Sequence, residues 1–310
     1  MKLRAGVAGA GAMGRNHARV FSLLDDVDLV AVYDRDKAQA QSVAAEFGGI
    51  AVDSLDAFAE AVDAATVAVP TIAHREVGCT LMEKGVHVLM EKPIADSLDD
   101  ARALIETSHR FEKILQVGHI ERFNPVMKEL EDRLTEPRFI EAHRLSPFPN
   151  RSIDIGVVLD LMIHDLEIIL HLVKSPVESV DAVGVAVMTF REDIANARVR
   201  FANGCVANVT ASRISPERMR KIRVFQSDCY LSLDYQEQSA EMYRMGSAGI
   251  EKVEVNVEKD EPLKRELASF VDCARVGAAP AVSGQQGAAA LDLALEITNL
   301  INQSPAAATL

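Results

Sequence analysis

The chain has 310 residues, of which 48% are hydrophobic and 25% charged, and its formal net charge is −13. This length suits two domains better than a single core, and the composition is that of a folded globular protein. The acidic balance argues against sequence-independent binding to nucleic acids, because such binding needs a basic surface that displaces counterions. No apolar run approaches the roughly 20 residues that cross a bilayer, so we expect no membrane span.

The cysteines and the first residues indicate the compartment. The four cysteines form neither a CxxC motif nor a spacing typical of metal ligands: Cys79, Cys205, Cys229 and Cys273. Scattered cysteines of this kind are typical of reduced thiols in a cytosolic protein. The first residues lead directly into a strand and a glycine loop, so we expect no cleavable signal. These features together predict a cytoplasmic protein.

Short valine-rich runs alternate with helical patterns in residues 1–118. The expected strands are Leu3–Ala8, Asp28–Tyr33, Ala65–Val69, Val86–Met90 and Ile114–Val117. Runs with so few charges are typical of parallel strands buried on both faces. Ser97, which precedes two aspartates, indicates the start of one of the intervening helices. The alternation predicts a Rossmann domain, an α/β fold with a doubly wound parallel sheet.

Residues 119–310 follow a different pattern. Helices are expected at Pro125–Leu134, Ile155–Val173, Leu263–Val276 and Gln285–Ile301. Strands are expected at Phe139–Leu145, Val177–Val187, Ile194–Phe201, Cys205–Ala211, Ile222–Gln226, Tyr230–Asp234 and Val253–Val257. Asn203-Gly204 is a strong two-residue hairpin turn, and Ser227-Asp228 is a weaker one. We therefore expect an α+β domain for substrate binding and oligomerisation, with one large open, mainly antiparallel sheet. The C-terminal helix could pack back on the first domain.

An open sheet with a long helix on one face leaves its other face uncovered. Large exposed apolar patches are rare on monomers. The sequence therefore predicts a homodimer or homotetramer that assembles through the open sheet face.

Gly9-Ala10-Gly11-Ala12-Met13-Gly14 is a GxGxxG motif between the first strand and an amphipathic helix. In this context Gly9 permits the tight turn, Gly11 lets backbone N–H groups approach a pyrophosphate, and Gly14 lets the helix pack on the strand. The helix N-terminus adds the positive end of its dipole. These features predict a dinucleotide site rather than a glycine-rich turn without a ligand.

The strand after this helix ends in Asp34, 20 residues beyond Gly14. A carboxylate at this place accepts hydrogen bonds from the adenosine ribose and repels a 2′-phosphate, which favours NAD over NADP. Arg35 beside it leaves NADP possible.

Two further groups carry candidate chemistry. Lys92, in Glu91-Lys92-Pro93 at the carboxyl end of the fourth strand, could stabilise an oxyanion, or could be a surface lysine in a turn. Asp160 and His164 lie four residues apart on one face of the long apolar helix. They form either a structural pair or a site in which His164 accepts a proton and Asp160 orients it. A metal site is a third reading, but no second cluster offers the missing ligands.

These motifs together resemble the glucose–fructose oxidoreductase / inositol dehydrogenase / MocA family over nearly the whole chain. The resemblance rests on Gly9–Gly14, on Pro70-Thr71 with His74, on Glu91-Lys92-Pro93 and on the segment 160–165. It implies oxidation of a secondary alcohol of a sugar, cyclitol or sugar nucleotide, with NAD(P) as hydride acceptor. It also implies that Lys92, Asp160 and His164 are the catalytic residues and that the Lys92–Pro93 bond is cis. The cofactor residues implied are Gly9, Gly11, Ala12, Met13, Gly14, Asp34, Arg35, Pro70, Thr71, His74, Glu91 and Lys92.

A narrower resemblance to the bacterial UDP-N-acetylglucosamine 3-dehydrogenase subgroup rests on the segments 118–125, 144–148 and 158–165 and on Arg151. That subgroup makes a 3-keto sugar nucleotide, which an aminotransferase converts for lipid A biosynthesis. Four arginines could reach a diphosphate, since arginine suits bidentate phosphate contacts: Arg122, Arg144, Arg151 and Arg213. The substrate residues implied are Lys92, His119, Arg122, Asn124, Arg151, Asp160 and His164.

Other functions stay open beside oxidation of a sugar nucleotide. One is a dehydrogenase of the same family for a free sugar, inositol or aldose acid. Another is a non-redox member that uses NAD transiently. The third is a non-catalytic NAD-sensing protein, against which the presence of Lys92, Asp160 and His164 argues.

Overall fold

The computed structural model describes residues 2–148 and 155–303. The chain forms two compact units. The first contains the residues up to Phe123 and the segment Glu261–Ala288, and the second contains Asn124–Asp260 and the chain from Ala289 onward. The sequence places the boundary at 118/119 and assigns 261–288 to the second domain. The difference arises because apolar residues of 261–288 pack in the core of the first unit, and such long-range packing cannot be seen in the local sequence pattern.

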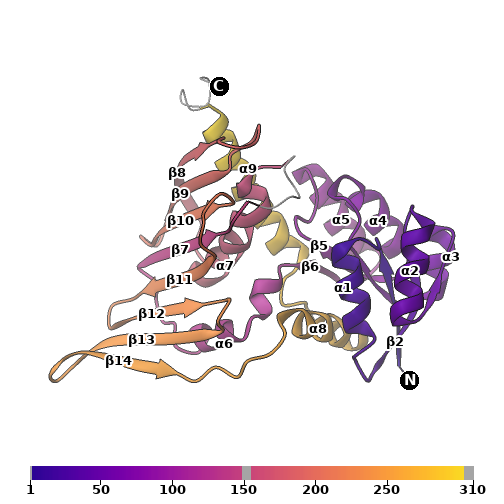
Figure 1. Cartoon of the computed structure of the whole chain (residues 1–310), viewed down its shortest axis with the longest axis horizontal. Helices are drawn as coiled ribbons and strands as arrows, with labels where there is room; N and C mark the ends of the chain where they lie inside the picture. The colour runs from indigo at the N-terminus through magenta and orange to yellow at the C-terminus, as the bar shows by residue number, and fades with distance from the viewer. Residues whose placement is uncertain (1, 149–154, 304–310) are drawn as a thin grey trace. The chain divides into compact units, whose positions relative to one another are not determined.

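The first unit has a six-stranded parallel sheet of order β3-β2-β1-β4-β5-β6, of which Figure 1 labels β2, β5 and β6. Its strands are β1 (Leu3–Ala8), β2 (Val27–Tyr33), β3 (Ile50–Ala51), β4 (Ala64–Val67), β5 (His87–Glu91) and β6 (Leu115–Gly118). The strand order reverses between β1 and β4, and doubly wound sheets bind ligands at such a point. The predicted Rossmann fold is confirmed, although β3 was not expected from the sequence.

Helices pack on both faces of this sheet. They are α1 (Ala12–Phe21), α2 (Lys37–Phe47), α3 (Leu55–Ala61), α4 (His74–Glu83), α5 (Leu98–Arg110) and α8 (Pro262–Val276). The helix α1 contacts α2 and α8, whereas α4 contacts α3 and α5. The expected start of α5 is confirmed, since the Ser97 side chain accepts a hydrogen bond from the backbone N–H of Asp100 at 3.2 Å. Side-chain caps of this kind satisfy backbone donors that a helix start leaves unpaired.

The second unit has an eight-stranded sheet of order β14-β13-β12-β11-β7-β10-β9-β8, shown in Figure 1. Its strands are β7 (Phe139–Leu145), β8 (Val177–Val185), β9 (Ile194–Phe201), β10 (Val206–Ser212), β11 (Met219–Phe225), β12 (Cys229–Asp234), β13 (Ser239–Gly246) and β14 (Gly249–Val255). Only β7 and β10 pair in parallel, so the mainly antiparallel sheet is confirmed. The strand β13 was not expected from the sequence, because its many polar and charged residues conceal the pattern typical of a strand.

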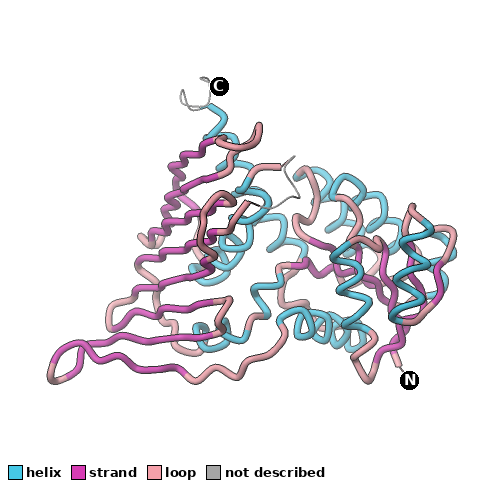
Figure 2. Tube along the Cα trace, in the orientation of Figure 1, coloured by secondary structure: helices cyan, strands magenta, loops and turns pink. Residues whose placement is uncertain are grey.

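The two faces of this sheet differ in chemistry. Apolar side chains of the inner face pack with α6 (Pro125–Glu131), α7 (Ile163–Val173) and the part of α9 (Gly284–Gln303) that follows Ala289. Figure 2 shows these helices on one side of the strands. The outer face carries polar pairs, such as Asn196 with Thr210 at 2.8 Å. It also carries a row of rings, Phe139, Phe225, Tyr230 and Tyr243, with successive centroids 5.7, 5.0 and 4.5 Å apart. The outer face is therefore of mixed polarity rather than broadly apolar.

The described residues contain no membrane-spanning helix, no metal-binding cluster and no disulfide. Among them no helix combines the length and apolarity needed to cross a membrane. No group of three or more histidine, cysteine or acidic side chains in the same residues is placed to hold a metal ion. The four cysteines are not joined in disulfides.

Candidate functional site

The glycine loop between β1 and α1 leaves one specific space open. Gly9 has a φ of +97°, which favours glycine, and a Cβ there would lie 2.5 Å from the backbone carbon of Ala68. A Cβ at Gly14 would lie 1.7 Å from the carbonyl oxygen of Gly9, so this helix start also requires glycine. A Cβ at Gly11, in contrast, would meet nothing within 4 Å. Gly11 and Ala12 are exposed at the helix N-terminus, which suits the backbone approach of a pyrophosphate.

Asp34, which follows β2, holds the glycine loop in place by hydrogen bonding. Its carboxylate accepts hydrogen bonds from the backbone N–H of Ala10 at 2.6 Å and of Asp36 at 2.8 Å. Arg35 is exposed and forms an ion pair with Glu76 at 3.4 Å. A carboxylate thus lies beside the glycine loop, whereas the neighbouring guanidinium is paired with another acid.

Cofactor preference follows from this arrangement. We expect Asp34→Ser to narrow or reverse the preference for NAD over NADP, because the repulsion of a 2′-phosphate is lost. Dissociation constants for both dinucleotides, measured by calorimetry, check this expectation. Asp25→Ser, which changes an exposed aspartate of the same unit, is the control. Equal affinities of the wild type for NAD and NADP would contradict the role given to Asp34.

The ends of β4 and β5 are joined by a buried histidine. His74 has Nε2 at 3.0 Å from the Val69 oxygen and Nδ1 at 3.0 Å from the Pro93 oxygen. Burial lowers its pKa, so near neutral pH the ring carries a single N–H, which donates to one of the two carbonyl oxygens at a time. Its ring nitrogens face these carbonyls, so His74 positions the corner rather than offering a free group to a cofactor. Pro70 is exposed and Thr71 is half-buried beside it, and the Lys92–Pro93 bond at this corner is cis, as the resemblance implied.

A buried ionisable layer lies beneath Glu91-Lys92. The Glu91 carboxylate lies 3.1 Å from Nε2 of the fully buried His17, and it accepts a hydrogen bond from the Lys92 backbone N–H at 3.2 Å. Glu266 of α8 is fully buried, and within the described residues neither of its carboxylate oxygens has a hydrogen-bond partner. Burial, and next the charge of Glu91, raise the pKa of Glu266 well above its ordinary value. Burial thus favours the protonated, uncharged form of Glu266.

The buried acid makes stability depend on pH. A carboxyl whose pKa is raised on folding stabilises the fold fully below its unfolded pKa and loses this contribution as pH rises through the folded pKa. Glu266→Gln removes the titration. The variant should gain stability relative to the wild type by about 1.4 kcal/mol for each pH unit above the unfolded pKa, until the folded pKa is passed.

Urea unfolding at several pH values between about 5 and 8, which spans the window above the unfolded pKa of a glutamate, measures this difference. Glu106→Gln, at an exposed glutamate of α5, is the matched control and should show no such trend. A difference between Glu266→Gln and the wild type that does not change with pH would mean that Glu266 is already charged in the fold.

Two cations lie close enough to a buried histidine to affect its titration. His119 is fully buried, and burial, followed by the charges of Lys92 and Arg122, lowers its pKa to about 3. His119 is therefore a neutral ring beside the Lys92 corner and does not act as a base near neutral pH. The first unit thus brings together three of the predicted site residues, Lys92, His119 and Arg122.

In the second unit, Asp160 and His164 stand at the start of the long apolar helix. This segment is not one continuous α-helix as the sequence predicts: Val158–Met162 forms a π-helical turn, η3, and α7 follows at Ile163. Asp160 lies within the π turn and His164 in the first turn of α7, both half-buried. Single π turns inside helices occur frequently at functional sites.

Other predicted substrate residues have structural partners. Arg144 and Arg213 are buried, and they form ion pairs with Asp165 and Asp193, each at 2.8 Å. The hypothesis that these two arginines bind a diphosphate is therefore wrong, since removing either from its acid would leave a buried charge unpaired. The Asn124 side chain caps α6 through the N–H of Val126 and donates to the oxygen of Tyr235. Arg151 lies outside the described residues.

Sequence reasoning missed the residues that hold the two candidate regions in place. His17 and Glu266 lie beneath Glu91, and Glu192 and Asp193 lie at the start of η3. An acid at an otherwise apolar position of a helix, as at Glu266, is the only sequence signal among these residues. Their partners are distant in sequence, so no spacing rule identifies them.

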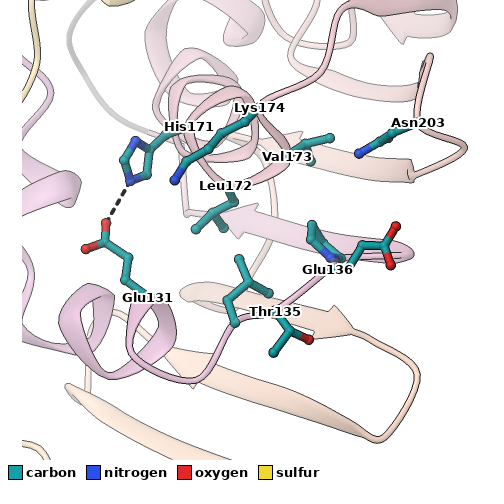
Figure 3. A pocket seen from close by; sticks show the side chains of 10 residues that line it. Glu131, Thr135, Glu136, His171, Leu172, Val173, Lys174 and Asn203 are labelled. Atoms are coloured by element: carbon teal, nitrogen blue, oxygen red, sulfur yellow. Dashed lines mark hydrogen bonds and ion pairs between the residues drawn. The ribbon is translucent and has the colours of Figure 1, made fainter.

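The second unit also has a pocket of about 280 Å³ at the C-terminal end of α7, shown in Figure 3. An ion pair between His171 and Glu131, at 2.8 Å, crosses it, and Lys174 and Glu136 also line it. The pocket is at the small end of ligand pockets, which occupy roughly 300–1,000 Å³. None of the predicted site residues lines it.

Comparison with known proteins matches both units. The model of an oxidoreductase family with an NAD-binding Rossmann fold matches residues 3–119. The model of the GFO/IDH/MocA C-terminal domain matches residues 130–231.

Similarity to individual proteins extends over nearly the whole chain. The UDP-N-acetylglucosamine 3-dehydrogenase of Acidithiobacillus ferrooxidans is 36% identical, over 95% of this chain and 96% of the relative. Its solved structure has a TM-score of 0.93 at 35% identity, and the match covers 97% of this chain and 98% of the other. The scyllo-inositol 2-dehydrogenase (NAD(+)) of Bacillus subtilis is 25% identical, over 96% of this chain and 94% of the relative.

Proposed function

Since the chain belongs to the GFO/IDH/MocA family of NAD-dependent oxidoreductases that act on CH–OH groups, we propose that it oxidises UDP-N-acetylglucosamine to the 3-keto sugar nucleotide. The observation that carries this proposal is the 36% identity, over 95% of this chain, to a dehydrogenase named for that substrate. The inositol dehydrogenases are the second candidate, supported by the similarity to the scyllo-inositol enzyme over 96% of this chain.

We assign the cofactor residues from the geometry of the first unit. The open space at Gly11 fits a pyrophosphate, which the backbone of Gly9–Gly14 would hold at the helix N-terminus. Asp34 would accept the hydrogen bonds of the adenosine ribose. NAD, when bound, supplies the acceptor for the hydride that leaves the substrate carbon.

Three side chains carry the proton chemistry in this proposal. Lys92 holds the substrate hydroxyl oxygen and stabilises its developing negative charge as the C–H bond breaks. His164 accepts the hydroxyl proton, and Asp160 orients the donor and acceptor groups. His119 remains neutral there and can donate or accept one hydrogen bond without adding charge.

Arg122 is the candidate for the diphosphate among the described residues. Arg144 and Arg213 are committed to buried carboxylates, whereas Arg122 is half-buried next to the His119 and Lys92 region. A positive group in a protein of net charge −13 favours an anionic ligand over a neutral cyclitol. Arg151 stays in the proposal as a second phosphate ligand.

The substrate is tested by turnover and by competition. Formation of NADH, followed at about 340 nm, should occur with UDP-N-acetylglucosamine, and UDP alone should inhibit competitively. Arg122→Ala should weaken UDP inhibition by about 10-fold, since a charge-assisted phosphate contact is lost. Arg102→Ala, at an exposed arginine of α5, is the control. Turnover of inositol or a free hexose without inhibition by UDP would reject the sugar-nucleotide substrate and favour the second candidate.

The proposal also covers the reaction that consumes the product and the compartment in which it occurs. The 3-keto product is a substrate for an aminotransferase, which would place this enzyme in lipid A biosynthesis in the cytoplasm. Unpaired cysteines among the described residues fit a reducing compartment.

We also propose a homodimer or homotetramer formed through the outer sheet face. The row of four rings on this face, which begins with Phe139 and ends with Tyr243, offers aromatic contacts. Light scattering after size exclusion measures this state.

A further inference from the structure

Glu192, from the loop between β8 and β9, bonds the first turn of the segment that carries Asp160 and His164. The residue before η3, Val157, provides no side-chain cap. Its backbone N–H instead donates to the backbone oxygen of Glu192 at 2.9 Å. The next N–H, of Val158, donates to the Glu192 carboxylate at 3.3 Å. Glu192 therefore accepts the hydrogen bonds of two donors that a helix start leaves unpaired.

The chain leaves room for this carboxylate by having glycine at position 156. Glu192 is only 6% exposed. A Cβ at Gly156 would lie 1.8 Å from one carboxylate oxygen of Glu192 and 2.3 Å from the other. The backbone of Gly156 is not in the left-handed region that favours glycine. The space occupied by Glu192, rather than the conformation of the backbone, therefore requires a glycine at this position.

The loop that contains Glu192 is itself held firmly. The neighbouring Asp193 is fully buried, and its carboxylate accepts hydrogen bonds from the backbone N–H groups of Val187, Met188 and Thr189. Arg213 joins Asp193 at 2.8 Å and also donates to the backbone oxygen of Ile155 at 2.7 Å. This network connects the loop between β8 and β9 directly to the residues that precede η3.

We propose that Glu192 is a positioning residue of the reaction, and that its carboxylate caps η3 and thereby sets the direction of Asp160 relative to His164. The inference rests on the proposed function, which assigns those two residues to the chemistry. A π turn contains one residue more than an α turn, so its loss would rotate Asp160 relative to His164 by about 100°, the angle per residue of an α-helix. A negative charge at a helix N-terminus also stabilises that end.

Five variants test the role of the carboxylate. Glu192→Ala removes it, and kcat should fall about 10- to 100-fold, as expected for displaced catalytic groups, with NAD affinity unchanged. Glu192→Gln retains an oxygen that accepts from Val158, so kcat should stay within about 3-fold of the wild type. Glu217→Ala, at an exposed glutamate of the same unit, is the control.

The remaining two variants introduce a carboxylate at position 156. Gly156→Asp alone should be strongly destabilised, because its side chain meets Glu192. Combined with Glu192→Ala, the same aspartate has space and can accept from the N–H two residues on, the ordinary N-cap geometry. The double variant should recover most of the kcat that Glu192→Ala loses. Such rescue from another position would not be expected if Glu192 served only to fill space.

The ring resonances of His164, assigned with His164→Asn and followed by NMR, give a readout that needs no substrate. The His164 resonances should shift in Glu192→Ala, and they should have their wild-type positions in Glu192→Gln and in the double variant. Wild-type kcat and unshifted resonances in Glu192→Ala would overturn the proposal. If Glu192→Ala does not fold, a folded double variant with low kcat and shifted resonances would overturn it equally. Absence of turnover in the wild type would reject the proposed function, and the resonances would still decide the role of Glu192.

Discussion

Replacing Lys92 with alanine should lower kcat by about 100-fold or more, the usual loss for a donor that stabilises a developing oxyanion. The side chain stands at the end of β5, at the corner formed with Pro93, where doubly wound sheets bind their ligands. NAD affinity should change little, because the glycine loop and Asp34 are untouched. Steady-state kinetics combined with calorimetric titration of NAD separate the two effects.

His164→Ala should show a loss of similar size, since a positioned proton acceptor typically contributes about 100- to 10,000-fold. Lys84→Ala, at an exposed lysine of the first unit, is the control for the loss of a positive charge. Near-normal kcat in both Lys92→Ala and His164→Ala would return these residues to a structural role.

The second large effect is expected when a glycine of the GxGxxG motif is replaced, and it concerns NAD binding and the stability of the fold. Gly11→Val should abolish measurable NAD binding, with a loss of at least about 100-fold in affinity, because its side chain would fill the space that fits the pyrophosphate. The melting temperature should be almost unchanged, since a Cβ at Gly11 meets nothing within 4 Å and the backbone φ is −67°. Calorimetry and thermal unfolding measure the two quantities on the same sample.

Gly14→Ala provides the matched contrast. Its Cβ would lie 1.7 Å from the carbonyl oxygen of Gly9, so the helix start must shift. Overpacking of this kind costs about 1–3 kcal/mol or more, which exceeds the gain of up to about 1 kcal/mol from replacing a helical glycine with alanine. We therefore expect a lower melting temperature as well as weaker NAD binding. If Gly11→Val bound NAD normally, the open space at Gly11 would have to serve another ligand.

Local pattern in the sequence is sufficient to predict the fold class of both units. Buried parallel strands need uninterrupted apolar runs, so the strands of the first unit stand out against the amphipathic helices between them. The roles of the glycine loop and of Asp34 are also local, since they depend on residues that lie close together along the chain. The antiparallel pairing of β9 and β10 is also local, although the predicted two-residue turn is wrong: the loop is 202–204, with Gly204 at a φ of +85°.

Only the tertiary structure decides what each charged side chain contacts. Arg144 and Arg213 are compatible with a phosphate site as far as the sequence goes, yet in the fold they pair with acids about twenty positions away in buried surroundings. Glu266 lies on a helix that is distant in sequence from Glu91, and its raised pKa arises from burial and from that neighbour. Glu192 reaches Val158 across 34 positions. Such partners are chosen by burial and by the cost of leaving a charge unpaired, which depend on the packing of distant segments and not on local spacing.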